Sequence, residues 1–183
     1  IASCLVGSEM CIRDSWEPVK FGLEPNYVIS KKEEECLNSA LKELKKEKPL
    51  QYILGFSSFM DLKFEVNTSV LIPRPETEEL VEWIVSDEKL IRSKEVLDIG
   101  TGSGCIAITL KHLRSRLHVS ALDISTKAIE VAENNARNNS VKVQFHQADI
   151  LTKKNWITPL DIIVSNPPYV LPSCLLYTSP SPR

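Results

Sequence analysis

The sequence predicts an α/β fold in which helices cover both faces of a parallel sheet. Three observations predict it: short apolar runs alternate with amphipathic segments after residue 94, a glycine-rich turn follows the first run, and an aspartate ends the second. This alternation is typical of parallel strands, because each needs a long crossover to reach the next. The 183 residues, 43% hydrophobic and 25% charged, suffice for one medium domain and a small appendage.

Both ends of the chain are predicted to be foreign to the natural protein. The segments LVGSEMCIRD (5–14) and CLLYTSPSPR (174–183) can be encoded by one DNA oligonucleotide that is translated in opposite orientations, one base out of phase. That relation resembles translated sequencing adapter, and a frayed N-terminus with a Ser/Pro-rich tail is the alternative. Residues 1–15 and 174–183 are therefore expected to take no part in the fold, and the natural protein to continue beyond both junctions.

Residues 16–50 are predicted to be the remnant of a helical N-terminal domain. Leucines recur at helical spacing in a Lys/Glu-rich background over residues 31–48, which predicts an amphipathic helix that ends near Pro49. The apolar stripe of this helix consists of Leu37, Leu41 and Leu44.

Residues 51–90 are predicted to link that remnant to the sheet. Aromatic and β-branched residues around Gly55 predict a short hairpin over 52–66. Pro75 suits the first turn of a helix, and the acidic residues after it complement the helix dipole, so a helix is expected from there to about residue 86. The predicted inward face of that helix consists of Leu80, Val81 and Ile84.

Residues 91–173 are predicted to form the sheet and its helices. One helix follows the glycine-rich turn, and another spans residues 125–138. The predicted strands are EVLDI (95–99), HVSALD (118–123), VKVQFH (141–146) and DIIVS (161–165). The apolar positions of the helices are Ile106, Ile108 and Leu110 in the first and Ala128, Ile129, Ala132 and Ala136 in the second.

The turn after the first strand is predicted to bind a cofactor. Its residues are Gly100, Thr101, Gly102, Ser103 and Gly104. Glycines let the backbone turn sharply and approach a ligand, and Asp123 after the second strand is placed to accept hydrogen bonds from ribose hydroxyls. Nicotinamide-binding loops use similar parts, but G-x-G-x-G spacing favours S-adenosylmethionine. A tight turn beside a solvated aspartate is the alternative.

Asp149 and Ile150, after the third strand, are predicted to face the adenine of the same cofactor. The carboxylate can accept a hydrogen bond from the exocyclic amino group, and the isoleucine can pack against the ring. An aspartate after a strand is also an ordinary turn residue, and that alternative stays open.

Asn166, Pro167, Pro168 and Tyr169 directly follow the fourth strand and predict a catalytic loop. An amide nitrogen is a poor nucleophile because its lone pair is delocalised, so an enzyme must hold it in line and polarise its N–H groups. We expect the Asn166 side-chain oxygen and the Pro167 carbonyl to accept those N–H groups, and Tyr169 to offer a flat face. Proline lacks a backbone N–H, so few donors compete. A rigid turn that closes the strand is the alternative.

Composition argues against several functional classes. The formal net charge of −2 gives no electrostatic argument for a nucleic-acid partner. No apolar run is long enough to span a bilayer, and no secretory signal is evident. The five cysteines have no metal-ligand spacing, so we expect no bound metal. Together these features predict a cytoplasmic protein with no membrane partner.

Taken together, the motifs resemble the HemK/PrmC family of protein-(glutamine-N5) methyltransferases, which modify peptide chain release factors. The resemblance covers residues from about 31 to 171. Besides G-x-G-x-G, Asp123 and N-P-P-Y, it rests on PLQYILG (49–55), LIPRPETE (71–78) and the stretch 96–107. N-P-P-Y alone is shared with adenine-N6 DNA methyltransferases.

The resemblance implies a Rossmann-like fold, S-adenosylmethionine as cofactor and the Gly-Gly-Gln loop of a release factor as partner. It implies that residues 100–104 and Asp123 bind the cofactor, with Ile150 by the adenine. Asn166 would contact cofactor and substrate, and residues 167–169 would hold the glutamine amide. Residues 74–78 are expected to pack near the site.

The family's sheet has seven strands, so the resemblance also implies that this chain stops after the fourth. We therefore expect residues 162–164 to form an open edge, and the chain by itself to be unstable and weakly active. Two other functions stay open. Adenine-N6 methylation of DNA or RNA shares the loop chemistry but needs a basic surface. An inactive cofactor-binding fragment fits the missing strands but not the intact motifs.

Overall fold

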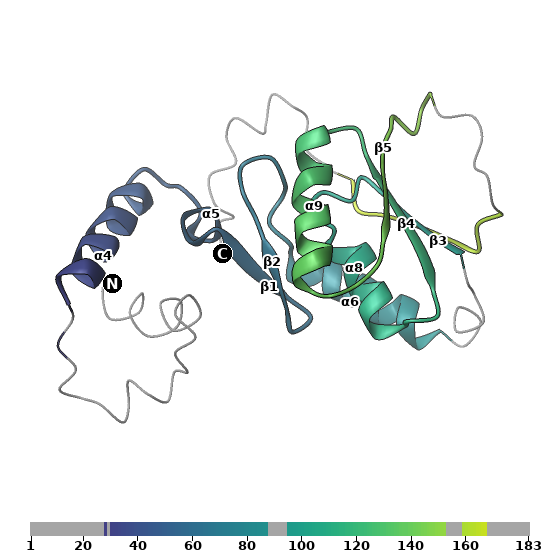
Figure 1. Cartoon of the computed structure of the whole chain (residues 1–183), viewed down its shortest axis with the longest axis horizontal. Helices are drawn as coiled ribbons and strands as arrows, with labels where there is room; N and C mark the ends of the chain where they lie inside the picture. Colours follow the sequence, from purple (N-terminus) through teal and green to yellow (C-terminus); the bar gives the residue numbers. More distant parts are fainter. Residues whose placement is uncertain (1–27, 29, 88–94, 153–158, 168–183) are drawn as a thin grey trace. The chain divides into compact units, whose positions relative to one another are not determined.

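The computed structural model of the protein describes residues 28, 30–87, 95–152 and 159–167 (Figure 1). The chain divides into two compact units, Ile1–Leu54 and Gly55–Arg183. The predicted foreign ends lie outside the described residues, as do Pro168 and Tyr169. The glycine-rich turn and Asn166 both belong to the second unit.

The first unit contains the predicted amphipathic helix, α4 (Lys31–Leu44), followed by the short α5 (Leu50–Leu54). Ser30 and Glu33 begin α4 with a capping box, in which each side chain binds the other residue's backbone N–H. The predicted stripe of leucines is half-buried. The helix ends earlier than predicted, because the chain turns after Leu44 and reaches a left-handed φ of 62° at Glu47.

The second unit begins with the predicted hairpin, β1 (Phe56–Phe59) and β2 (Leu62–Glu65), which pair antiparallel. Its two-residue turn has positive φ at Met60 and Asp61, as a tight hairpin requires. The buried Phe59 and Phe64 rings meet edge to face with centroids 6.0 Å apart. The prediction was too long at its start, because Tyr52 and Ile53 donate to the Pro49 carbonyl and form α5.

The predicted parallel sheet is confirmed, with strand order β5-β4-β3-β6. The strands are β3 (Glu95–Ile99), β4 (His118–Asp123), β5 (Gln144–Gln147) and β6 (Ile162–Ser165). β5 starts three residues later than predicted, because the Val141 N–H donates to the Ala136 carbonyl and closes the preceding helix. β6 lies at one end of the described sheet, as expected, and its Ile163 is 62% exposed.

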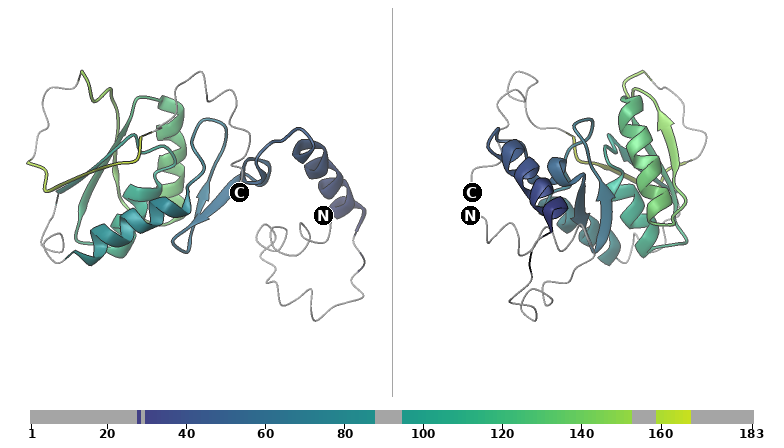
Figure 2. Two further views of the ribbon diagram at one scale, coloured as in Figure 1. Left: turned by 180° about the vertical axis from the view of Figure 1, so that it is seen from behind. Right: turned by 60° about the vertical axis from the view of Figure 1, so that its left-hand side comes forward.

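Three helices accompany the sheet: α6 (Pro75–Ser86), α8 (Cys105–Leu113) and α9 (Thr126–Asn138). Right-handed crossovers from β3 to β4 and from β4 to β5 run in the same direction across the sheet, so α8 and α9 cover the same face. α6 packs against α8, and α8 packs against α9 (Figures 1 and 2). Helices were predicted on both faces of the sheet, whereas the helices of this unit among the described residues lie on one face.

The core of the second unit lies between that sheet face and the helices. Its buried side chains include those that were predicted to face inward on α6, α8 and α9, apart from Leu80, which is partly buried. The core joins the sheet residues Val96, Val119, Ala121, Ile162 and Val164 to Val81, Ile106, Ile108, Leu110, Phe59 and Phe64. The hairpin is therefore part of the same folded unit as the sheet.

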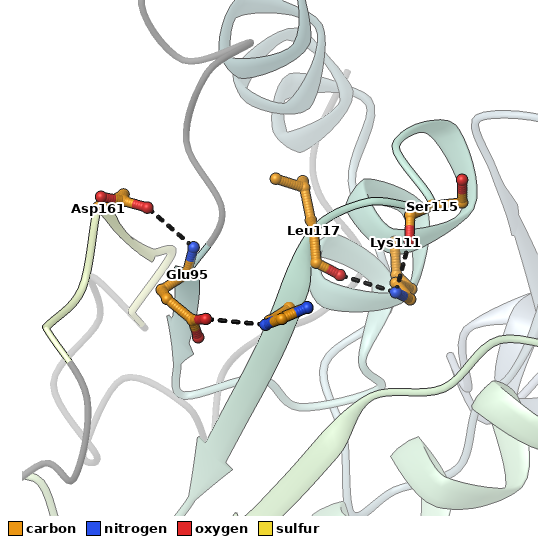
Figure 3. A network of polar contacts seen from close by, with 6 residues as sticks. Glu95, Lys111, Ser115, Leu117 and Asp161 are labelled. Atoms are coloured by element: carbon orange, nitrogen blue, oxygen red, sulfur yellow. Dashed lines mark hydrogen bonds and ion pairs between the residues drawn. The ribbon is translucent and has the colours of Figure 1, made fainter.

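Polar contacts tie the strands together at their amino ends (Figure 3). The Glu95 backbone N–H donates to Asp161 Oδ2 at 3.0 Å, and the Glu95 carboxylate lies 2.8 Å from His118 Nδ1. Lys111 Nζ donates to the Ser115 and Leu117 carbonyls in the loop that precedes β4. This network lies at the edge opposite the predicted site, so we assign it to structure.

Candidate active site

The glycine-rich turn and Asn166 meet at the carboxyl edge of the sheet. β3 and β6 are neighbouring parallel strands, with Ile99 opposite Ser165 at their ends. The Ser165 hydroxyl donates to the Ile99 carbonyl at 2.8 Å, which ties these ends together. The turn begins directly after Ile99, and Asn166 directly follows Ser165. The fold therefore brings together two motifs far apart in sequence, at the edge where open α/β sheets bind ligands.

A pocket opens between these two loops. One wall is the glycine-rich turn with the first residues of α8, and Asn166 adjoins it. The other wall comes from the segment that leads into α6: Leu71, Ile72, Pro73, Arg74 and Thr77. The volume of this pocket is about 50 Å³, far below the several hundred cubic ångströms of a complete small-molecule site. The pocket can hold an amino-acid group, so a nucleoside would have to lie outside it.

The backbone of the turn is open at two of its glycines and packed at the third. A Cβ at Gly100 or Gly102 would have no heavy atom within 4 Å, so a ligand can approach the backbone there. Gly104 has a left-handed φ of 82°, and a Cβ on it would lie 2.8 Å from Ile108 Cδ1 and 3.1 Å from Ala132 Cβ. Gly104 therefore lets α8 approach α9 closely.

Asp123 is held against the turn by backbone groups. Its Oδ2 accepts from the Gly102 N–H at 3.0 Å, and its Oδ1 accepts from the Ser125 N–H at 2.9 Å. Each carboxylate oxygen has a second lone pair, and the side chain is half-buried, so it can still accept from ligand hydroxyls. The geometry adds a second role to the predicted one, because Asp123 also fixes the shape of the turn.

Asp98 is a buried residue that opens the glycine-rich motif and to which sequence analysis assigned no role of its own. It lies beneath the turn with 0% exposure, and its Oδ2 accepts from the Thr101 hydroxyl at 2.7 Å. Burial raises the pKa of Asp98 to about 6; the Thr101 hydrogen bond opposes this rise, and the charge of Asp123 adds to it. The available signal was an acidic residue inside an otherwise apolar strand.

Asn166 contacts α6 through its side chain. Its Nδ2 donates to Thr77 Oγ1 at 2.8 Å, and Thr77 is buried in the first turn of α6. Asn166 is half-buried, and Pro167 is exposed. Pro168 and Tyr169 lie outside the described residues, so their predicted substrate contacts stay predictions.

The segment 74–78 packs near the site, as expected, and it also makes specific contacts. Arg74 and Thr77 line the pocket. Glu78 Oε1 accepts from the Met60 N–H at 2.7 Å, in the turn of the hairpin. The first turn of α6 therefore links the loop that contains Asn166 to the hairpin.

Asp149 takes up the turn geometry that was left as the alternative. Its Oδ1 accepts from the Leu151 N–H at 2.9 Å, and its carbonyl accepts from the Thr152 N–H at 3.1 Å. Ile150 beside it is half-buried. Ile124 directly follows Asp123 and is 66% exposed, so it offers apolar surface beside the carboxylate that sequence analysis did not single out. An apolar residue after a strand-ending aspartate was the available signal.

Asn135 on α9 joins the glycine-rich turn to the hairpin. The side chain is fully buried; its Oδ1 accepts from the Glu65 N–H at 2.6 Å, and its Nδ2 donates to the carbonyls of Glu65 and Ser103. Because the Asn135 side chain is buried and makes all three hydrogen bonds, it holds β2 and the glycine-rich turn in fixed positions relative to α9. Sequence analysis gave no signal for it, because its partners lie on distant segments.

The ranges that the structure describes contain neither a metal-binding cluster nor a membrane-spanning helix. No group of three or more His, Cys, Asp or Glu side chains within them is arranged to hold a metal ion. None of the helices within them has the length and apolar character needed to cross a membrane.

The fold and the site define a class, and comparison with known proteins gives the family. The parallel sheet with a glycine-rich turn after β3 is that of an α/β methyltransferase domain, and the profile of the methyltransferase small domain family matches residues 76–173. The chain belongs to that family. The profile of the PrmC N-terminal domain matches residues 13–55, which confirms the HemK/PrmC resemblance. This match starts inside the segment predicted to be foreign, whose boundary stays a prediction.

Curated relatives agree with this assignment. The release factor glutamine methyltransferase of Flavobacterium psychrophilum is 50% identical over 135 residues, covering 72% of this chain and 47% of that protein. Its counterpart in Lactococcus lactis is 48% identical over 143 residues, covering 78% and 52%. The chain therefore spans about half the length of these relatives.

A solved structure supports the Rossmann-like fold. Pyrococcus abyssi tRNA (uracil-54, C5)-methyltransferase in complex with S-adenosyl-L-homocysteine is 22% identical, with a TM-score of 0.50. The match covers 61% of this chain and 28% of that chain. At this identity the likeness shows the fold alone.

Proposed function

We propose that the full-length protein methylates a side-chain amide nitrogen of glutamine in a peptide chain release factor, with S-adenosylmethionine as the methyl donor. The observation that carries the proposal is the position of Asn166, whose side chain lines one pocket with the glycine-rich turn. The names of the relatives at 48–50% identity support this choice of substrate.

The residues at the turn fit the proposed cofactor. Gly100 and Gly102 leave open space where a side chain would otherwise stand, so the amino-acid end of the cofactor can approach the backbone. Asp123 retains lone pairs for ribose hydroxyls, and the exposed Ile124 provides apolar surface for adenine. When bound, S-adenosylmethionine supplies an electrophilic methyl group on a positively charged sulfur.

Asn166 and Pro167 fit the proposed substrate. A glutamine amide has two N–H groups, and the Asn166 side-chain oxygen and the Pro167 carbonyl are acceptors on one donor-poor loop. These two hydrogen bonds hold the amide nitrogen in one orientation and stabilise the positive charge that develops on it as the N–C bond forms. With S-adenosylmethionine bound, the nitrogen would take its methyl group as the sulfur–methyl bond breaks, and S-adenosylhomocysteine would leave. The nitrogen would afterwards release one proton to solvent, so no general base is required before transfer.

The proposal is tested with the full-length protein, radiolabelled S-adenosylmethionine and three substrates. These are a release factor, the same release factor with its Gly-Gly-Gln glutamine changed to alanine, and adenine-containing DNA. We expect label on the unaltered release factor alone. Label on DNA would favour the adenine-N6 alternative, and the absence of label on every substrate would refute the proposal.

A further inference from the structure

We propose that Thr77 is a positioning residue that orients the carboxamide of Asn166, so that its oxygen rather than its nitrogen faces the substrate amide. This inference deepens the proposed function and rests on it. It is carried by one contact: Asn166 Nδ2 donates to Thr77 Oγ1 at 2.8 Å, across 89 residues of sequence.

The orientation of Asn166 matters because the two ends of a carboxamide have opposite hydrogen-bonding character. The oxygen accepts, whereas the NH2 group only donates. A substrate amide that presents N–H groups would meet a second donor if Asn166 were turned round, and the acceptor that holds it would be lost. A neighbour that accepts from Nδ2 therefore turns Oδ1 away from itself.

Thr77 is suited to this task because it belongs to a rigid part of the fold. It is 5% exposed and lies in the first turn of α6, where its N–H donates to the Arg74 carbonyl at 3.0 Å. Pro75 at the start of the helix fixes the local backbone, and Glu78 anchors the same turn to the hairpin through Met60. Asn166, in contrast, lies in a loop after a four-residue strand.

The contact also gives a chemical reason for threonine at this position. Valine has nearly the same shape but no lone pairs, so it fills the space without accepting from Nδ2. Serine keeps the hydroxyl and loses only a methyl group. These substitutions therefore separate hydrogen bonding from packing.

The chain offers a matched control on the neighbouring helix. Thr109 on α8 is also fully buried, and its hydroxyl has no hydrogen-bond partner among the described residues. It does not line the pocket. Thr109→Val therefore makes the same chemical change in the same core without altering a contact to the site.

The kinetic test compares full-length Thr77→Val, Thr77→Ser and Thr109→Val with the unmodified enzyme on a release factor. We expect Thr77→Val to lower kcat by about 10–100-fold through misalignment, with little change in the affinity for S-adenosylhomocysteine. Thr77→Ser should stay within about threefold of the unmodified enzyme, since it keeps the acceptor. Thr109→Val should leave kcat unchanged. Equal kcat for Thr77→Val and the unmodified enzyme would overturn the inference.

A double variant distinguishes positioning from general support of the structure. If Thr77 acts through Asn166, Thr77→Val should cause no further loss of kcat in an Asn166→Ala background. A further loss equal to that in the single variant would show a separate structural role and overturn the inference.

A direct measurement keeps this inference separate from the proposed function. By NMR, one side-chain N–H of Asn166 should be protected from solvent exchange in the unmodified protein and in Thr77→Ser, but not in Thr77→Val. Loss of protection together with an inactive unmodified enzyme would refute the proposed function and leave the orientation standing. Equal protection in all three proteins would refute the orientation itself.

Discussion

At the scale of single residues, Asp98 makes the stability of the site depend on pH. Its folded-state pKa of about 6 lies above the ordinary value of 3.8, because burial disfavours the carboxylate. The contribution of Asp98 to stability is therefore fully present below pH 3.8 and is lost as pH rises through 6. A carboxylate under the glycine-rich turn thus lowers the stability of the protein at neutral pH.

Asp98→Asn should remove this dependence. Between pH 4 and pH 8 the unmodified protein should lose up to ~3 kcal/mol of unfolding free energy relative to the variant, which has no proton to release. Urea unfolding of both proteins across that range measures the difference. Parallel stability profiles would show that Asp98 does not titrate as its burial implies.

Gly104 offers a second test at this scale. Gly104→Ala should destabilise the fold by about 2–4 kcal/mol, since the new Cβ meets Ile108 and Ala132 in a left-handed backbone conformation. Gly102→Ala is the control: it shares the positive φ but meets no neighbour, so it should cost only about 1 kcal/mol. Equal losses in thermal unfolding would contradict the packing role.

At the scale of elements, the hairpin is held to the sheet domain by two side chains from different helices. Glu78 on α6 binds the Met60 N–H in the hairpin turn, and Asn135 on α9 binds both backbone groups of Glu65 in β2. Asn135 also binds the carbonyl of Ser103 in the glycine-rich turn. The hairpin and the glycine-rich turn therefore share one buried amide.

Asn135→Ala should loosen both elements at once. It leaves the Glu65 N–H and two carbonyls without their partner, so we expect a loss of about 3 kcal/mol. Hydrogen exchange should quicken in the hairpin and in the turn together. Asn138→Ala, an exposed position on the same helix, should change neither. Unaltered exchange in the turn of the Asn135 variant would disprove the coupling.

The elements that sequence predicted well are those whose limits are set locally. α6 begins at Pro75 and ends at Ser86, as the proline and the acidic first turn indicated, and the apolar runs gave β3 and β4 their observed limits. Where a backbone hydrogen bond that no residue type signals sets a boundary, the prediction was wrong. The Val141 N–H donates to the Ala136 carbonyl and closes the end of α9, so β5 starts only at Gln144.

The same distinction applies to the site. The glycine-rich turn, Asp123 and Asn166 are found in sequence because each carries its chemistry in a short motif. The segment that contains Thr77 was expected near the site, but its contact with Asn166 was not. Neither that contact nor the role of Asn135 can be found in sequence, because the partners lie 89 and 70 residues away and only the fold brings those segments together.

At the scale of the whole molecule, we expect the strand at the end of the described sheet to promote association between copies of this chain. β6 ends the described sheet, with Ile163 62% exposed between Ile162 and Val164, which are both buried. An apolar side chain on an open edge strand favours association between chains.

Ile163→Lys should reduce the association of this 183-residue chain, as measured by light scattering, without unfolding it. The neighbouring Ile162→Lys is the control, because Ile162 is 8% exposed and a buried lysine should unfold the protein. Scattering by the Ile163 variant equal to that of the unmodified chain would contradict an edge effect.

The molecule as a whole concentrates its proposed chemistry at one edge, where the glycine-rich turn supplies the cofactor wall and Asn166 supplies an acceptor. The direct test is the single-turnover rate of methyl transfer to a release factor by the full-length enzyme and by its Asn166→Ala variant. We predict a loss of about 100–1,000-fold, the range found when one preorganised hydrogen bond to a reacting group is removed. Methyl transfer by the variant at an undiminished rate would contradict the account.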